Sequence, residues 1–173
     1  MPEDLLEVRK SKKFEATTDA ACIKQADTVV TVIGTPLDEH LNPRLEVYGD
    51  MLRKDRSFLR NGQLLILRST VYPGTTDHVA HALKVAGIEV DVAFCPERVA
   101  QGVALEEIHS LPQIVSGTSP RAIERASKLF RLLTPDIIEL PTVGAELTKL
   151  YNNTWRYIQF ATANQFYMIA NDY

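Results

Sequence analysis

The charged pair Glu97-Arg98 has residue types suited to chemistry on a phosphorylated substrate. The pair comes shortly after an apolar segment that ends at Phe94, with Cys95 and Pro96 between them. A carboxylate in such a place can act as a base, and a guanidinium can hold a phosphate group. A surface salt bridge, which is common and contributes little, explains the same two residues equally well.

A second group of polar residues lies near the end of the chain. Glu146, Lys149, Asn153 and Arg156 follow one another at intervals of three, four and three positions. On an α-helix, with about 100° per residue, these four side chains share an arc of roughly 80°. The spacing predicts one polar stripe, and a solvated helix face with an ordinary Glu-Lys pair is the alternative.

The remaining reactive residue types show no site pattern. The four histidines have no consistent metal-ligand spacing, so no metal site is expected. Cys95 precedes a proline at the end of an apolar segment and has no His or Lys partner in view, as a nucleophile would require. We therefore interpret Cys95 as a packing thiol.

Strand and helix patterns alternate along the chain and would position these residues. Short apolar or β-branched runs predict strands, and amphipathic spacings between them predict helices. The alternation favours an α/β fold, a parallel sheet with helices on both faces. The predicted strands are 27–33, 63–68, 88–94, 113–115 and 137–140, and the predicted helices are 45–59, 75–86 and 120–133.

Three loops follow consecutive predicted strands, where ligands bind in open α/β sheets. They are Gly34-Thr35-Pro36, the segment 69–76 and the segment 94–102. Hydroxyls and glycine amides in the second loop, close to a helix N-terminus, are suited to phosphate or ribose oxygens. Turn and cap formation accounts for any one of these loops alone.

The last thirty or so residues form a different pattern. No glycine or proline follows Gly144 as far as Tyr173, so we expect one long helix. The chain stops while the helical pattern continues, without a clear cap.

Composition narrows the class of protein. With 173 residues, 45% hydrophobic, 24% charged and a net charge of -3, we expect a single compact, soluble domain. The longest apolar runs are far shorter than the roughly 20 residues that span a bilayer, and no secretory signal is evident. We expect a cytoplasmic protein with neither a membrane nor a nucleic-acid partner.

Four ordered segments resemble the UDP-glucose/GDP-mannose dehydrogenase family, also called nucleotide-sugar 6-dehydrogenases. Segment 26–36 is similar to the family's strand and cofactor loop, 69–75 to its next loop, 94–102 to its Pro-Glu segment, and 145–164 to its central helix. The run 96–99 and Asn153 followed by Arg156 are more similar to the UDP-N-acetylhexosamine branch, which includes UDP-N-acetylmannosamine dehydrogenases.

The resemblance implies residue roles. Enzymes of this family oxidise the C6 alcohol of the sugar to a carboxylate with two NAD, through a thioester on a cysteine. The ammonium of Lys149 would stabilise developing oxyanion charge, and Glu97 would assist the water that releases the acid. The implied NAD contacts are Thr35, Pro36 and Thr70; the implied contacts to the UDP-sugar are Arg98, Val99, Lys149, Asn153 and Arg156; the implied catalytic group is Lys149, Glu97 and Asn153.

Two family features are missing from this sequence. No Gly-x-Gly-x-x-Gly loop for the pyrophosphate is present, and the family's cysteine lies beyond the central helix. We therefore expect residues 1–142 to form a partial Rossmann-like NAD-binding domain that lacks its first βαβ unit. Residues 143–173 would begin the central helix, through which the full-length protein forms a homodimer. The fragment alone is predicted to bind NAD weakly, if at all, and to have no turnover.

Two alternatives stay open. One is another Rossmann dehydrogenase acting on hydroxy acids, similar to the 6-phosphogluconate type, which would not require Pro96-Glu97-Arg98 at a strand end. The other is a non-catalytic module that dimerises or binds nucleotide.

Overall fold

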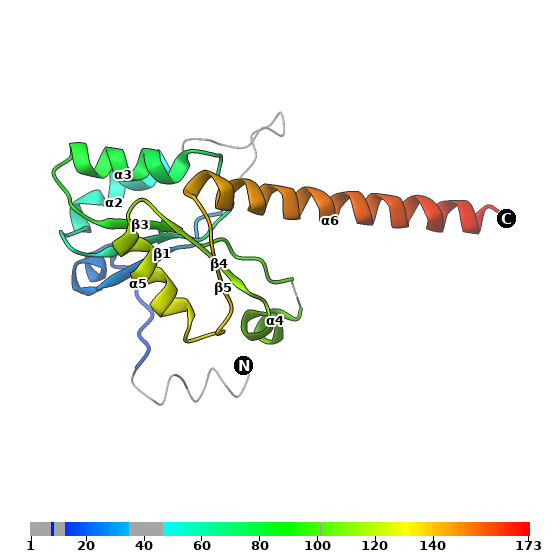
Figure 1. Ribbon diagram of the computed structural model, residues 1–173, viewed down its shortest axis with the longest axis horizontal. Helices are drawn as coiled ribbons and strands as arrows, with labels where there is room; N and C mark the ends of the chain where they lie inside the picture. Colours follow the sequence, from blue (N-terminus) through cyan, green and yellow to red (C-terminus); the bar gives the residue numbers. More distant parts are fainter. Residues whose placement is uncertain (1–7, 9–12, 35–46, 101) are drawn as a thin grey trace.

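A five-stranded sheet forms the centre of the protein, seen here in a computed structural model that describes residues 8, 13–34, 47–100 and 102–173 (Figure 1). The strands lie side by side in the order in which they occur along the chain. They are β1 (Thr28–Thr31), β2 (Leu64–Leu67), β3 (Asp91–Phe94), β4 (Gln113–Gly117) and β5 (Ile137–Glu139).

The sheet is mostly parallel, with one exception. Strands β1, β2 and β3 pair in parallel, whereas β4 runs antiparallel to β3, with Phe94 opposite Ser116. The chain between β3 and β4, which contains α4 (Ala104–Ser110), stays at the end of the sheet where β3 stops, so β4 must run back. The α/β class with a mostly parallel sheet is confirmed, and the β3–β4 pair is the antiparallel exception.

Helices cover both faces of the sheet, as predicted. Helices α2 (Val47–Asp55) and α3 (Thr75–Val85) lie on one face, and α5 (Pro120–Phe130) lies on the other (Figure 1). The predicted helix 45–59 ends as a separate short turn, η2 (Arg56–Phe58). The short helices η1 (Ala20–Gln25) and α4 were not predicted.

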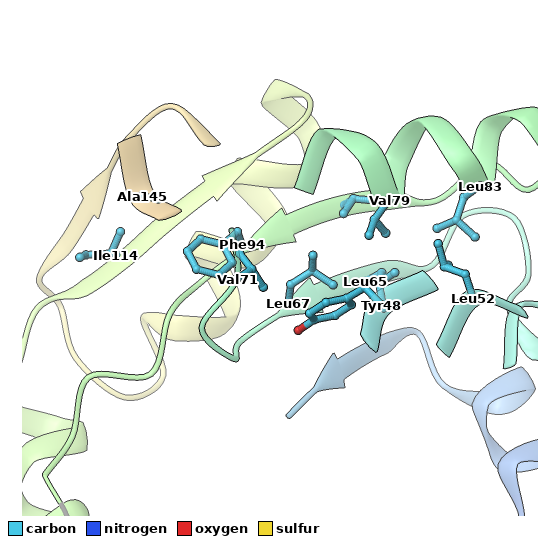
Figure 2. Close-up of a cluster of buried hydrophobic side chains, with 11 residues drawn as sticks. Tyr48, Leu52, Leu65, Leu67, Val71, Val79, Leu83, Phe94, Ile114 and Ala145 are labelled. Carbon is cyan, nitrogen blue, oxygen red and sulfur yellow. The ribbon is translucent and has the colours of Figure 1, made fainter. Parts of the chain in front are cut away.

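The core consists of two layers separated by the sheet. Leu65, Leu67 and Phe94 face Val79 and Leu83 of α3 in the layer drawn in Figure 2. On the opposite face, Leu64, Ile66 and Ala93 pack against α5. Successive residues of β2 therefore enter different layers, which explains why this strand is a continuous apolar run rather than an alternating one.

The final helix, α6 (Thr142–Asn171), begins before Gly144 and passes through it. Only its first turns pack against the domain: Ala145 and Glu146 are buried, and every residue from Tyr151 onward is exposed. Figure 1 shows the rest of α6 extending well beyond the sheet. None of the described helices combines the length and apolarity needed to cross a membrane.

Candidate functional site

The residues predicted to do chemistry gather at the carboxyl edge, the side of the sheet where β1, β2 and β3 end. Thr70 follows β2 there and is half-buried, and the segment 95–99 follows β3. Helix α6 passes the same edge, because the main-chain oxygen of Glu97 accepts a hydrogen bond from Lys149. Thr35 and Pro36 lie outside the described residues.

One cavity brings together most of the predicted substrate contacts. It has a volume of about 230 Å³ and opens between α4, α6 and the chain after β3. Its lining comprises Arg98, Glu107, Leu111, Lys149, Asn152, Asn153, Trp155, Arg156 and Gln159. Four of the residues that the resemblance implies as substrate contacts, up to 58 positions apart in the chain, thus line one cavity: Arg98, Lys149, Asn153 and Arg156.

Lys149 lines this cavity from α6. It is half-buried, and its ammonium donates to the main-chain oxygen of Glu97. Burial lowers the pKa of Lys149; the Glu97 charge opposes this, and the charges of Arg156, Arg98 and Arg68 lower the pKa further. The Lys149 ammonium thus lies near three arginine side chains, and a group in such surroundings is stabilised by an anionic ligand.

The carboxylate of Glu97 is not part of the cavity lining, and both of its oxygens have partners. One oxygen pairs with the guanidinium of Arg68, and the other accepts from the amides of Arg98 at 2.7 Å and Val99 at 3.0 Å. Partial burial by itself raises the pKa of Glu97, but the Val99 amide, the Arg68 charge and the Arg98 amide lower it overall. The group stays ionised, yet both of its oxygens are already bound, so its role as a base for water stays a prediction.

The loop after Glu97 is fixed from two sides. The Arg98 guanidinium donates to the main-chain oxygen of Pro112 at 3.1 Å, just before β4. Arg156 of α6 donates to the main-chain oxygen of Arg98 at 3.5 Å. Val99 donates its amide to Glu97 and is not among the residues that line the cavity, so its contact to the UDP-sugar stays a prediction.

Glu146 does not join the polar stripe that its spacing predicts. It is fully buried, and its carboxylate accepts from the amides of Gly74 at 2.6 Å and Thr76 at 2.8 Å and from the Thr76 hydroxyl at 2.6 Å. These donors form the start of α3, where a carboxylate satisfies amides that have no partner inside the helix. Gly74, with φ +90°, adopts the left-handed conformation that this turn requires. The prediction fails because the first turns of α6 pack on α3 and the later turns do not.

Sequence reasoning missed two residues that shape the site. Arg68 closes the apolar run of β2 and is 8% exposed, and Glu107 accepts a hydrogen bond from the Ala100 amide at 2.5 Å. An arginine directly after four buried apolar residues was the available signal, since a charge in such a place needs a partner.

Cys95 is not a reactive thiol. It is fully buried, and desolvation raises the pKa of the thiol to about 12, against the weaker opposing effects of a Ser116 hydrogen bond and the Arg68 charge. This supports its interpretation as a packing residue.

Groups suited to part of a dinucleotide remain at the carboxyl edge. Within the described part of the chain, the Thr70 hydroxyl makes no hydrogen bond. The buried Tyr48 hydroxyl lies near Thr31 and Ser69 but hydrogen-bonds to neither. Figure 2 shows this oxygen at the margin of the apolar cluster. These hydroxyls fit a ribose or carboxamide group.

Comparison with known proteins gives the geometry a context. Residues 2–134 match the family model described as the UDP-glucose/GDP-mannose dehydrogenase family, NAD binding domain. The chain therefore belongs to the UDP-glucose/GDP-mannose dehydrogenase family. The matched domain makes NAD the cofactor of this family and sets aside the 6-phosphogluconate-type alternative.

Individual relatives lie within the same family. The chain is 31% identical over 175 residues to the UDP-N-acetyl-D-mannosamine dehydrogenase of Pyrococcus horikoshii, covering 98% of this chain and 42% of the relative. The solved structure of that enzyme superposes with a TM-score of 0.85, over 96% of this chain and 41% of that one. The UDP-N-acetyl-D-glucosamine 6-dehydrogenase of Pseudomonas aeruginosa is 26% identical, over 97% of this chain and 42% of its own length. The chain thus spans less than half the length of these relatives.

Proposed function

We propose that this chain is part of an NAD-dependent nucleotide-sugar 6-dehydrogenase that oxidises the C6 alcohol of a UDP-hexosamine, such as UDP-N-acetylmannosamine, to the uronic acid. The observation that carries the proposal is the convergence of Arg98, Lys149, Asn153 and Arg156 on one cavity. Relatives that act on UDP-N-acetylhexosamines, by their names, support this substrate class.

The charge of the cavity favours an anionic ligand. Among its described lining residues, Arg98, Lys149 and Arg156 are cationic, and Glu107 is the one carboxylate. Glu107 already accepts the Ala100 amide. A diphosphate or a developing oxyanion would offset this unbalanced positive charge, and the side chain of Asn153 can orient a neighbouring hydroxyl.

The size of the cavity limits what it holds. A volume of about 230 Å³ lies below the roughly 300–1,000 Å³ of sites that enclose a whole drug-sized ligand. The described residues therefore enclose one part of a nucleotide sugar, and a complete site requires groups outside this cavity. The described residues would also contact only part of NAD, because Thr70 and Tyr48 would reach the ribose or nicotinamide half alone.

Nucleotide binding by the 173-residue chain tests the substrate site directly. We expect UDP to bind in a calorimetric titration and Lys149→Met to weaken it by about tenfold, the worth of one charge-assisted hydrogen bond. Lys128→Met, which removes an exposed lysine of α5, is the matched control and should leave the affinity unchanged. Equal affinities for all three proteins would refute the site.

An assay of NADH production tests whether the 173-residue chain is a complete enzyme or part of one. Mixed with NAD and UDP-N-acetylmannosamine, the chain should give no sustained NADH absorbance, because the sequence lacks the glycine loop that a pyrophosphate needs. Sustained NADH production would overturn this part of the proposal. Nucleotide binding without any turnover, even when the chain is extended to the length of its relatives, would instead favour a non-catalytic module.

Homodimer formation through α6 is the last part of the proposal. Beyond residue 150 this helix carries large exposed apolar side chains, among them Trp155, Ile158 and Phe160. Exposed apolar surface of this extent on one element is typical of an interface. Sedimentation should show a dimer that Phe160→Glu dissociates, and a monomer at all concentrations would contradict it. A cytoplasmic location stays a prediction of the sequence analysis.

A further inference from the structure

One buried arginine lies directly beneath the site and joins three strands and a helix. Arg68 is 8% exposed. Its guanidinium donates to the main-chain oxygen of Cys95 at 3.1 Å, to the carboxylate of Glu97 and, at 3.4 Å, to the side-chain oxygen of Gln113. Its guanidinium carbon lies over the Phe130 ring, 4.7 Å from the ring centre. Because three acceptors and an aromatic ring hold the guanidinium, the group has little freedom to move.

Arg68 and Lys149 bind different parts of Glu97. The Arg68 guanidinium holds the carboxylate on the side of the sheet, where the amides of Arg98 and Val99 also bind it. The main-chain oxygen of Glu97 is left to accept the Lys149 ammonium. The negative charge and the contact to Lys149 thus come from different atoms of one residue.

We propose that Arg68 is a positioning residue of this site, which holds the Glu97 carboxylate beneath the 97–99 loop so that the Lys149 ammonium remains available to an anionic ligand. The inference rests on the proposed function, because it assumes that the cavity receives the anionic part of a nucleotide sugar. Without Arg68, the Glu97 charge would be uncompensated and its nearest cations would be those of the cavity.

The charges around Lys149 give the direction of the effect. Glu97 and Arg98 belong to the segment after β3, Arg156 lies on α6, Arg68 follows β2, and Glu107 of α4 lines the same cavity. Glu97 raises the pKa of Lys149, and Arg68 lowers it. Removing Arg68 should therefore raise the Lys149 pKa on two counts, since a repelling cation disappears and an attracting carboxylate is unmasked.

The test is an NMR titration of the lysine ammonium groups in the 173-residue chain, with Lys149 assigned through Lys149→Arg. Arg68→Met should shift the Lys149 titration to higher pH and weaken UDP binding by about tenfold, as an unmasked carboxylate repels the ligand. An unchanged titration midpoint would overturn the proposal. If UDP fails to bind the unaltered chain, the proposed function fails, while the titration still decides the role of Arg68.

Arg125→Met is the matched control, because Arg125 also pairs with a carboxylate of the β3 region, Asp91, at the opposite edge of the sheet. A purely structural loss should lower thermal stability in both variants and leave the Lys149 titration unchanged in the control. If Arg68→Met does not fold, Arg68→Lys replaces it, since a lysine keeps the charge but cannot span the three acceptors.

The route through Glu97 is tested by repeating Arg68→Met in a Glu97→Gln background. The shift of Lys149 should be clearly smaller there, because no carboxylate remains to be unmasked. A shift of equal size in both backgrounds would show that Arg68 acts through its own charge alone, and would overturn the positioning role.

Discussion

Polar groups are paired with one another at the edge where the strands begin, whereas at the carboxyl edge several of the described cationic groups are not. At the edge where the strands begin, the fully buried Gln63 donates to the main-chain oxygens of Ile23 at 2.7 Å and Ala26 at 2.6 Å. Asp91, at the start of β3, binds Arg125 at 2.6 Å and also pairs with a second arginine. Polar groups there are matched to one another, and they join η1, the sheet and α5.

At the carboxyl edge, Arg68 and Glu97 still form a pair of opposite charges. Beyond that pair, Arg98, Lys149 and Arg156 surround a cavity with far less negative charge than positive charge. Unbalanced charge costs stability, so it persists where a ligand is to supply the balance. Polar groups at one edge therefore pair with one another, whereas the other edge leaves positive charge without a partner among the described residues, and the proposed function assigns that charge to an anionic ligand.

Glu146 is the exception at the carboxyl edge, and its loss should have the largest effect on stability. Glu146→Ala leaves two amides and the Thr76 hydroxyl without their acceptor in a fully buried place. We expect the free energy of unfolding to fall by about 3 kcal/mol. Chemical denaturation followed by circular dichroism measures this, with the exposed Glu124→Ala of α5 as the control. A loss as small as that of the control would mean that Glu146 is not a structural anchor.

Arg125→Met should produce the next largest loss of stability. The substitution removes the donors to Asp91 at 2.6 Å and to the main-chain oxygen of Gly62 at 2.9 Å. Arg121 still pairs with Asp91, and Arg125 is partly exposed, so we expect a loss of about 2 kcal/mol. Thermal unfolding with and without UDP is the measurement. An effect on UDP affinity would break the comparison, because this edge would then contribute to binding.

Much of this fold follows from local patterns in the sequence. The run Leu64–Leu67 predicts a strand buried on both faces, and it is one because α3 and α5 cover the two faces. The reversal at β4 was not predictable, since it depends on the chain between β3 and β4 staying at one edge of the sheet. Periodicity describes an element, but it contains no direction relative to a strand that is distant in sequence.

The candidate site shows the same limit at the level of single side chains. Lys149, Asn153 and Arg156 share a face as their spacing predicts, because all three lie where α6 passes the cavity. Glu146 has the same spacing but does not line the cavity, because it binds the start of α3 instead. Arg68 was overlooked because its partners lie on other strands, and only the assembled sheet brings them together.

The pH dependence of UDP binding should report on the uncompensated edge. Burial and the neighbouring arginines lower the pKa of Lys149, and its protonated form is the one that binds an anion. The affinity should therefore fall by about tenfold as the pH rises through the lowered pKa of Lys149, and the decline should begin at a lower pH than for a lysine with the usual pKa of about 10.4. Lys149→Met should abolish this decline. A decline that persists in the variant would assign it to another group.

Thiol labelling gives the smallest expected effect. It tests whether the buried layer beneath the cavity is closed to a reagent. Cys95 lies at the carboxyl edge beside the site, but it is fully buried and its pKa is raised to about 12, whereas Cys22 near the opposite edge is exposed. At pH 8 we expect one equivalent of iodoacetamide to react with the native chain, at Cys22, and none with Cys22→Ser. Mass spectrometry after digestion distinguishes the two sites. Labelling of Cys95 in the folded chain would show that the layer beneath the cavity opens, and that the order held by Arg68 does not extend to the thiol.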